Sequence, residues 1–459
     1  MYDIIIIGAG TAGIAAYKEA IKSTNNILII NDGDWDTTCA RVGCMPSKIL
    51  ISVANRMHDI QHADDLALTV QNQIDTSAVM QHVRQLRNRF TRATLKDVNS
   101  WNPEHRISGQ ATFVNQNTVQ VNHQQYQAKS FILAVGTTPI FDQQLKKEIG
   151  NKLITSDQIF ELPQLPQSIA VIGSGVIALE LAQALTRLNV ETTIFARSRK
   201  VGSLTSPQLQ TLAQEELSKE LNIKFEVLPN SIKKSGDIIH IEYTRDNINE
   251  SITVEYVLAA TGRQSNLGTI KLENIDEKFK TLKELPINPE NKQLAQYPIF
   301  IVGDAHTTTP IQHEAANEGR LAVYNCLNYP NIQSVKILTP LGILFSQPQM
   351  ATVGKSNKQL LHDNINFITG FVSYEKQGRA IVSATNQGAA ELYVDKKSRK
   401  LIGAELFVDS AEHLAHLLSW IISEDLTIDE ILQKPFYHPT LEEGLRTALK
   451  HARRQLDNN

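Results

Sequence analysis

The sequence predicts an α/β chain in which one strand–turn–helix–strand unit occurs twice, followed by a C-terminal part of α+β type. The first copy runs from the apolar segment Asp3–Ile7 through a glycine-rich turn and a helical pattern at Ile14–Lys22 to a second apolar segment at Ile27–Ile30. The second copy lies at Ser168–Phe195. After Lys336–Pro340, short alternating segments mix with helical patterns, which indicates a separate α+β domain.

Composition and charge are those of an ordinary globular protein, with 42% hydrophobic and 20% charged residues. The formal net charge is −3 and no block of like charges occurs, which argues against a nucleic-acid surface or a polybasic membrane patch. No apolar run is long enough to cross a bilayer. The first residues, Met1–Ile4, carry an acid where a secretory signal carries positive charge, so we expect a cytoplasmic location and a reducing compartment.

The turn of the first copy contains Gly8, Gly10 and Gly13 in a G-x-G-x-x-G pattern between a predicted strand and helix. The first glycine makes the turn, the second lets the backbone approach a pyrophosphate, and the third lets helix and strand pack closely. The helix N-terminus then offers N–H groups to the phosphates. The next strand should end in an acid that binds a ribose hydroxyl. Asn31 occupies that place and Asp32 follows it, and either side chain could accept the hydrogen bond.

The second copy has Gly173 and Gly175, with Ala178 as an allowed third residue. The strand after it, Thr192–Phe195, is followed by Arg197 rather than by an acid. A carboxylate there would favour NAD, whereas the planar fork of arginine suits the 2′-phosphate of NADP. The sequence therefore predicts two Rossmann-like dinucleotide-binding domains and favours NADP(H) over NAD(H) in the second.

The chain has three cysteines, Cys39, Cys44 and Cys326. A reducing compartment disfavours a structural disulfide, so the close pair indicates redox chemistry or a metal. A metal site needs about four ligands, and no second cysteine pair or nearby histidine completes one, so we expect no metal. The pair precedes a helical pattern at Ile49–Met57, and a helix N-terminus lowers the pKa of a cysteine thiol. Cys326 has no cysteine neighbour and is interpreted as a small buried hydrophobic residue.

The segment Cys39–Lys48 reads C-x-x-x-x-C-x-P-S-K, and together with the two glycine turns it resembles the pyridine nucleotide–disulfide oxidoreductases. Within that family it is most similar to the dihydrolipoamide dehydrogenases, over nearly the whole chain. The resemblance implies an FAD-binding domain, an NAD(P)-binding domain and an α+β dimerisation domain. The implied segments are 1–146 (FAD, first part), 147–266 (NAD(P)), 267–335 (FAD or central domain, second part) and 336–459 (dimerisation or interface).

The resemblance also implies roles for individual residues. Cys39 would exchange with the substrate, and Cys44 would face the flavin. Lys48 would lie near the flavin N5 atom and pair with Glu180. The remaining cofactor-binding positions lie at strand ends, beside the cysteines, or in the segment of the ribityl-binding acid and the helix under the flavin ring. These positions are Thr38, Ala134, Gly136, Gly262, Asp304 (the ribityl-binding acid), Ile311 and His313.

His438 and Glu443 form the remaining candidate pair, in the pattern H-P-x-x-x-E. Thiol–disulfide exchange needs a base and then an acid, and histidine serves as both near neutral pH. A carboxylate behind the ring fixes its tautomer. In the family this histidine reaches the active site of the partner subunit, so the resemblance implies a homodimer with shared active sites.

The function we expect is that of an FAD-dependent NAD(P)-disulfide oxidoreductase of the dihydrolipoamide dehydrogenase type. It would act on a small-molecule or lipoyl dithiol or disulfide and serve cell redox homeostasis. Arg197 supports an alternative, an NADPH-dependent reductase of glutathione or another low-molecular-weight disulfide. An alternative of another class is a non-catalytic flavoprotein redox sensor or a subunit that binds lipoyl carriers. Turnover with a disulfide would separate these classes, and the sequence leaves the substrate and the reaction direction open.

Overall fold

In the computed structural model of the chain, residues 1–306, 311–334 and 338–458 are described. Contacts divide the chain into two units. Unit 1 comprises Met1–Pro46, His82–Ile140 and Arg263–Ile337, and unit 2 comprises Ser47–Gln81, Phe141–Gly262 and Leu338–Asn459. The predicted boundary between residues 335 and 336 lies outside the described residues.

Unit 1 is built on a mainly parallel sheet. Its central strand β1 (Tyr2–Ile7) pairs in parallel with β2 (Ile27–Asn31) and with β6 (Gln124–Leu133). Ile4 to Ile7 are all buried, as expected for a strand covered on both faces. The outer partners are β3 (Arg106–Ser108), β17 (Ile299–Ile301), β4 (Thr112–Asn115) and β5 (Thr118–Val121).

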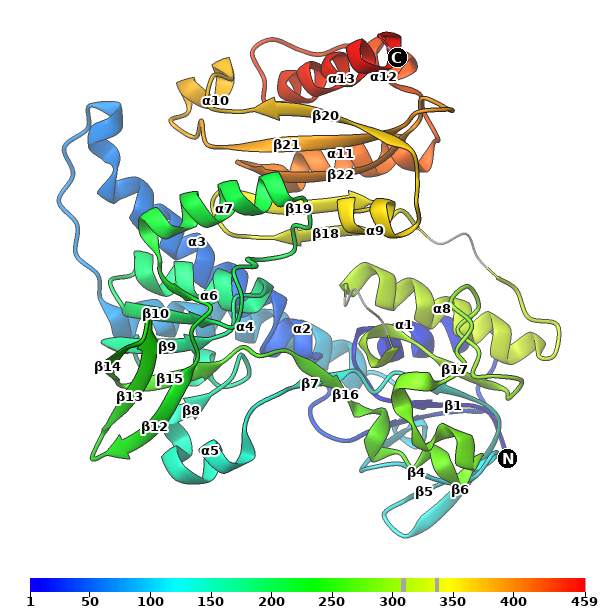
Figure 1. Cartoon of the computed structure of the whole chain (residues 1–459). Helices are drawn as coiled ribbons and strands as arrows, with labels where there is room; N and C mark the ends of the chain where they lie inside the picture. The colour runs from blue at the N-terminus through cyan, green and yellow to red at the C-terminus, as the bar shows by residue number, and fades with distance from the viewer. Residues whose placement is uncertain (307–310, 335–337, 459) are drawn as a thin grey trace. The chain divides into compact units, whose positions relative to one another are not determined.

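Two helices, α1 (Thr11–Ala20) and α8 (Gln312–Asn328), pack against each other and against this sheet (Figure 1). One core contains Ile4, Ile6 and the apolar residues of α1 and α8, and a second core contains Ile5, Ile7 and Phe131. The other elements that begin or lie in this unit are α2 (Thr38–Arg41), β7 (Thr137–Pro139), β16 (Arg263–Ser265) and most of α4 (Thr76–Asn99).

The nucleotide-binding part of unit 2 has a five-stranded parallel sheet in the order β11-β10-β9-β15-β8. Its strands are β8 (Leu153–Ile154), β9 (Ser168–Ile172), β10 (Glu191–Ala196), β11 (Asn222–Phe225) and β15 (Tyr256–Ala259). An antiparallel sheet follows, of β12 (Pro229–Ser235), β13 (Ile238–Arg245) and β14 (Ile248–Val254). The helices are α5 (Gln143–Ile149), α6 (Val176–Arg187) and α7 (Pro207–Glu220), and α3 (Cys44–Gln61) belongs here from Ser47 onward.

The C-terminal part of unit 2 has a five-stranded antiparallel sheet in the order β18-β19-β22-β21-β20 (Figure 1). Its strands are β18 (Leu341–Leu344), β19 (Gln349–Gly354), β20 (Phe367–Ser373), β21 (Gly388–Asp395) and β22 (Leu401–Val408). Helix α11 (Ala411–Ser423) packs on β19 and β22, and α13 (Glu442–Asp457) packs on β20 and β21. The short helices are α9 (Asn357–His362), α10 (Gly378–Val382) and α12 (Ile428–Leu432).

A buried carboxylate joins the two parts of unit 2. Glu405 of β22 has no exposed surface. Its oxygens accept the backbone N–H groups of Thr205 (2.6 Å), Ser206 (2.9 Å) and Asn357 (2.9 Å), and also the hydroxyl of Thr205 (2.5 Å). Ser206 is the N-cap of α7, so a residue of the C-terminal sheet supplies acceptors at the start of a nucleotide-domain helix.

The predicted fold class, two Rossmann-like domains with an α+β C-terminal domain, is confirmed. The helix predicted at Ile14–Lys22 begins earlier, at Thr11, and the helix predicted at Ile49–Met57 begins at Cys44. Pro46 can lie in the first turn of α3 because N–H groups there have no intrahelical partner. Within the described ranges, no helix has both the length and the apolar character needed to span a bilayer.

Candidate functional site

The first glycine turn closes tightly between β1 and α1. Gly8 has φ +103°, and a Cβ there would lie 2.3 Å from the carbonyl oxygen of Ala134. A Cβ at Gly13 would lie 1.8 Å from the carbonyl oxygen of Gly8. By contrast, a Cβ at Gly10 would meet no atom within 4 Å. Gly8 and Gly13 thus satisfy packing needs, whereas Gly10 borders open space at the N-terminus of α1, where a phosphate can approach the backbone.

The end of β2 shows how Asn31 and Asp32 differ. Asn31 is buried, and its side-chain oxygen accepts the N–H of Ala9 at 2.8 Å. Its amide nitrogen donates to the carbonyl oxygens of Gly33 (3.1 Å) and Asp34 (2.9 Å). The Asp32 side chain is exposed. Asn31 therefore holds the glycine turn against the end of β2, and Asp32 is the carboxylate turned to solvent.

Asp304 lies in a short 3-10 helix, Gly303–His306, that follows β17. Burial raises the pKa of its carboxyl above the ordinary value, while the positive charge of Arg263 lowers it. Glu318 of α8 raises the pKa of Asp304 further and accepts the N–H of Gly303 at 2.7 Å. The segment is thus fixed to α8, with Asp304 between a cation and a second acid.

Three further predicted positions lie shortly after β6 and at the start of α8. Gly136 has φ +63°, and a Cβ there would meet no atom within 4 Å. Ile311 is the N-cap residue of α8, and His313 is exposed in the first turn of that helix. Gly136 closely follows the carboxyl end of β6, and α/β sheets bind ligands at that edge.

The two cysteines lie on successive helices. Cys39 is half-buried in α2, and Cys44 is exposed as the first residue of α3. The Thr37 hydroxyl accepts the N–H of Ala40 at 3.2 Å and caps α2, which begins at Thr38. The loop returns closely at Gly43, where a Cβ would lie 3.1 Å from the carbonyl oxygen of Thr38. Both sulfur atoms therefore sit at helix N-termini, where a thiolate is stabilised.

An ion pair fixes α2. The Arg41 Nε atom donates to Asp36 at 3.0 Å, and an Nη atom lies 2.7 Å from an Asp34 carboxylate oxygen. Burial raises the pKa of Asp36, and the charge of Arg41 opposes that rise. Arg41 thus ties the cysteine-bearing helix to the loop that follows β2.

Lys48 and Glu180 meet in unit 2. The Lys48 Nζ atom lies 2.7 Å from Glu180 Oε2, and the Glu180 side chain is only 6% exposed. The other carboxylate oxygen of Glu180 accepts the N–H of Phe345 at 2.9 Å. The Lys48 ammonium also lies 4.5 Å from the centroid of the Phe345 ring. A charge-assisted bond and a cation–π contact therefore hold one ammonium in place.

The second glycine turn has the same geometry as the first. Gly173 has φ +123°, and a Cβ there would lie 2.4 Å from the carbonyl oxygen of Ala260, whereas a Cβ at Gly175 would meet no atom within 4 Å. Gly262 has φ +118° just after β15. Arg197, directly after β10, is exposed. The turn therefore has open space at Gly175, and the guanidinium of Arg197 lies directly after the neighbouring strand β10.

His438 and Glu443 are in contact. The His438 Nδ1 atom lies 3.1 Å from Glu443 Oε2, and the histidine side chain is 81% exposed. The N–H of Thr440 donates to Glu443 at 3.2 Å. This backbone bond, and then the contact with His438, lower the pKa of Glu443 below its usual value. A carboxylate thus lies behind one ring nitrogen, and the ring faces outward.

Comparison with known protein families identifies the family to which this chain belongs. Residues 2–319 match the family described as pyridine nucleotide-disulphide oxidoreductase, and residues 341–449 match the dimerisation domain of the same family. The chain belongs to the pyridine nucleotide-disulphide oxidoreductases. Members of this family depend on FAD and NAD(P).

Relatives in the family have different activities. The chain is 26% identical to dihydrolipoyl dehydrogenase of Geobacillus stearothermophilus, over 96% of this chain and 94% of that protein. It is 27% identical to mercuric reductase of Staphylococcus aureus, over 97% and 82%. Among solved structures, LpdA from Mycobacterium tuberculosis superposes with a TM-score of 0.82 at 19% identity, covering 98% of this chain and 99% of that chain.

Within each unit, the structure brings together several groups that the family resemblance assigns: Gly8, Gly13 and Ala134; Lys48 and Glu180; and His438 and Glu443. The contact of Phe345 with Lys48 was not predicted, because no local sequence pattern around Phe345 indicates a contact with α3. The role of Asn31 in holding Ala9 was also missed, although its place at the end of β2 was a signal. Among the described residues, no cluster of three or more His, Cys, Asp or Glu side chains could hold a metal.

Proposed function

We propose that the chain is an FAD-dependent NAD(P)-disulfide oxidoreductase that uses Cys39 and Cys44 as its redox pair and a lipoyl or small-molecule dithiol as its substrate. The observation that carries the proposal is the position of the two sulfur atoms at the N-termini of α2 and α3. Lys48 follows one helical turn after Cys44 on α3 and is held by Glu180. This arrangement favours thiolate chemistry over a structural role.

The residues of unit 1 fit FAD. The open space at Gly10 would admit the pyrophosphate, and the half-buried Asp304 would bind the ribityl chain. Asp32 is our preferred ribose ligand, because the side-chain oxygen of Asn31 already accepts the Ala9 N–H. When bound, FAD would supply two-electron transfer between the thiols and the nicotinamide. Thr38, Ala134, Gly136, Ile311 and His313 complete the set of residues that we propose to line this site.

Thiol–disulfide exchange follows from the chain's own groups. A substrate thiol loses its proton to His438 and attacks the Cys39 sulfur of the Cys39–Cys44 disulfide. The Cys39–Cys44 bond breaks, and Cys44 leaves as a thiolate. The second substrate thiol then attacks the substrate sulfur of the mixed disulfide, the bond to Cys39 breaks, and the proton of that thiol passes to Cys39. The substrate is thereby oxidised to a disulfide, the cysteine pair is reduced to a Cys39 thiol and a Cys44 thiolate, and His438 keeps the first proton. Glu443 keeps the imidazole oriented and stabilises its charged form.

We infer that His438 acts on the cysteines of a second copy in a homodimer. The presence of the family's dimerisation domain supports a homodimer, and the 81% exposure of His438 leaves its ring accessible to a partner. The segments proposed for the four functional parts remain 1–146, 147–266, 267–335 and 336–459.

For the coenzyme we favour NADP(H) over NAD(H). The second glycine turn is open at Gly175, Gly262 follows the neighbouring strand β15, and Arg197 is exposed beyond β10. An exposed guanidinium at that place would pair with a 2′-phosphate.

A second candidate is an NADPH-dependent reductase of glutathione or another low-molecular-weight disulfide, which the same arginine supports.

The test is a steady-state matrix of NADH and NADPH against lipoamide, dihydrolipoamide and glutathione disulfide, with purified flavin-loaded protein. We expect turnover with lipoamide or its reduced form, and its loss in Cys39→Ser and Cys44→Ser. Cys326→Ser is the matched control, because Cys326 lies on the buried face of α8 and its replacement should leave turnover unchanged. A flavin-loaded protein that turns over no disulfide would favour the sensor or carrier-binding alternative, whereas a protein that binds no flavin would refute the proposal.

A further inference from the structure

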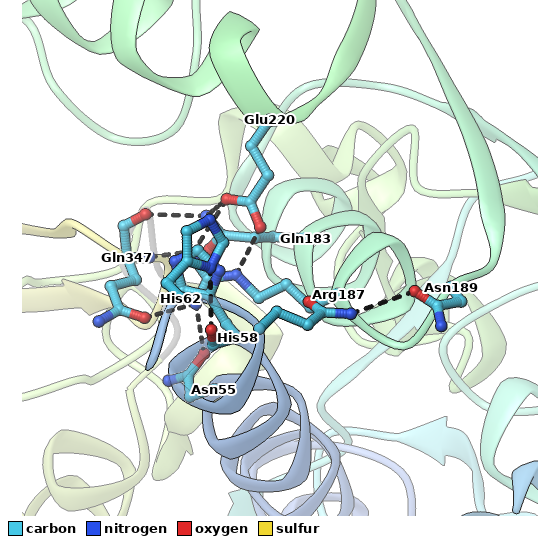
Figure 2. A network of polar contacts seen from close by, with 9 residues as sticks. Asn55, His58, His62, Gln183, Arg187, Asn189, Glu220 and Gln347 are labelled. Atoms are coloured by element: carbon cyan, nitrogen blue, oxygen red, sulfur yellow. Dashed lines mark hydrogen bonds and ion pairs between the residues drawn. The ribbon is translucent and has the colours of Figure 1, made fainter. Parts of the chain in front are cut away.

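Helices α3 and α6 are joined by two polar contacts about two turns apart. Lys48 Nζ lies 2.7 Å from Glu180 Oε2. Seven residues further along each helix, the side-chain oxygen of Asn55 accepts a hydrogen bond from Arg187 at 2.8 Å (Figure 2). Seven residues make about two helical turns, so the two contacts leave each helix from one face. They are therefore successive contacts of one interface between helices that run in the same direction.

Arg187 lies at the centre of this network. Its side chain is 3% exposed, and its guanidinium makes a bidentate pair with Glu220 of α7, at 2.5 and 3.0 Å. The same Nη1 atom that bonds Asn55 also donates to the side-chain oxygen of Gln347. The planar fork of arginine thus joins α3, α6, α7 and the segment that precedes β19. A lysine could not make these bonds together, because its ammonium is a single point charge.

The segment from Phe345 to Gln347 takes part in both contacts between α3 and α6. The N–H of Phe345 donates to Glu180 at 2.9 Å, and the Phe345 ring lies 4.5 Å from the Lys48 ammonium. Two residues later, the backbone of Gln347 exchanges two hydrogen bonds of 2.8 Å with the side chain of Gln183. The segment therefore lies along α6, and its ends are set by the Lys48 contact and the Arg187 contact.

The surroundings of Arg187 indicate that its hydrogen bonds matter more than the space that its side chain fills. A cavity of about 380 Å³, lined in part by His58, His62 and Thr385, already borders the guanidinium. Burial and then the Arg187 charge lower the pKa of His58 to about 4. The His58 imidazole is thus neutral at physiological pH, and Glu220 is the countercharge of Arg187.

We propose that Arg187 is a positioning residue for Lys48: it fixes the spacing of α3 on α6 and so holds the Lys48 ammonium between Glu180 and Phe345. The proposal deepens the proposed function and rests on it, since Lys48 follows the proposed redox residue Cys44 by one turn of α3.

The first test measures the acylation rate of the Lys48 amine by pulse labelling and peptide mass spectrometry in the full chain. Arg187→Gln and Asn55→Ala should each raise that rate by about fivefold, the effect of loosening one modest contact. Two controls should leave the rate unchanged. Ser52→Ala alters an exposed residue of the same helix, and Arg399→Gln removes an arginine that pairs with Asp429 and Asp457.

The second test uses the flavin-loaded protein and follows the thiolate-to-flavin charge-transfer absorbance against pH after partial reduction. A displaced Lys48 ammonium stabilises the thiolate less, so the midpoint should rise by about one pH unit, a tenfold change in ionisation. Arg187→Lys should not restore the parent midpoint, since it keeps the charge but loses the fork.

Parent-like labelling rates and midpoints in both Asn55→Ala and Arg187→Gln would overturn the proposal. If Arg187→Gln does not fold, Asn55→Ala decides alone, because it leaves the Arg187–Glu220 pair intact. A parent protein without flavin would refute the proposed function instead, and the labelling test would still decide whether Arg187 positions Lys48.

Discussion

Replacing Glu405 by glutamine tests whether the C-terminal sheet and the nucleotide-binding part of unit 2 depend on one carboxylate. The Glu405 side chain has no exposed surface, and its two oxygens accept three backbone N–H groups and one hydroxyl. Glutamine replaces one acceptor oxygen by an NH₂ donor, which would face two of these donors. A hydrogen bond to a charged group contributes about 1.5–3 kcal/mol, so the loss of two should cost roughly 3–6 kcal/mol.

The assay is thermal unfolding of the purified protein followed by circular dichroism. For a domain of this size class, each kcal/mol shifts Tm by roughly 2–4 °C, so Glu405→Gln should lower Tm by about 6 °C or more. Glu430→Gln is the matched control, because Glu430 is an exposed capping-box residue that glutamine can replace. If the Tm of Glu405→Gln were the same as the Tm of Glu430→Gln, the reasoning would be refuted.

Three other predictions concern the site. Arg197→Glu should shift coenzyme preference from NADPH toward NADH by at least about tenfold in kcat/KM, and an unchanged ratio, or a parent enzyme that already prefers NADH, would contradict the NADP assignment. His438→Gln should lower disulfide turnover by about 10²–10⁴-fold while flavin binding is retained, measured by steady-state kinetics beside a flavin spectrum. The folded-state pKa of Glu443 lies below the ordinary value of 4.5, so its contacts add stability that is present above that pH and is lost as the pH falls through the folded pKa. The difference in acid-unfolding curves between the parent and Glu443→Gln should therefore vanish at low pH, and a difference that persists there would contradict the sign.

Local patterns predicted the elements that build the sites. The spacing of Gly8 and Gly13 between an apolar run and a helix is a property of neighbouring residues, and the structure shows why each position excludes a side chain. The same holds for the second turn at Gly173. The start of α3 at Cys44 was misplaced because Pro46, Ser47 and Lys48 interrupt the apolar pattern on which the helix prediction rested.

Contacts between distant segments left no local signal. Arg187 reads as an ordinary arginine near the end of an amphipathic helix, yet it is buried and bonded to α3, to α7 and to Gln347. Glu405 reads as a polar residue in a strand, yet it is fully buried. In both cases the partner lies far along the chain, and only the folded arrangement supplies the compensating charge or donors that make such burial tolerable.

The shared carboxylate of Glu405 limits how the protein can be divided. A fragment that stops before Leu338 would retain the α7 N-terminus with the donors of Thr205 and Ser206 but without their acceptor. It would also lack Phe345 and Gln347, whose backbone groups complete the bonding of Glu180 and Gln183. The nucleotide-binding part and the C-terminal part of unit 2 are consequently not interchangeable modules. A chimera that grafts either onto a relative must carry both sides of these contacts.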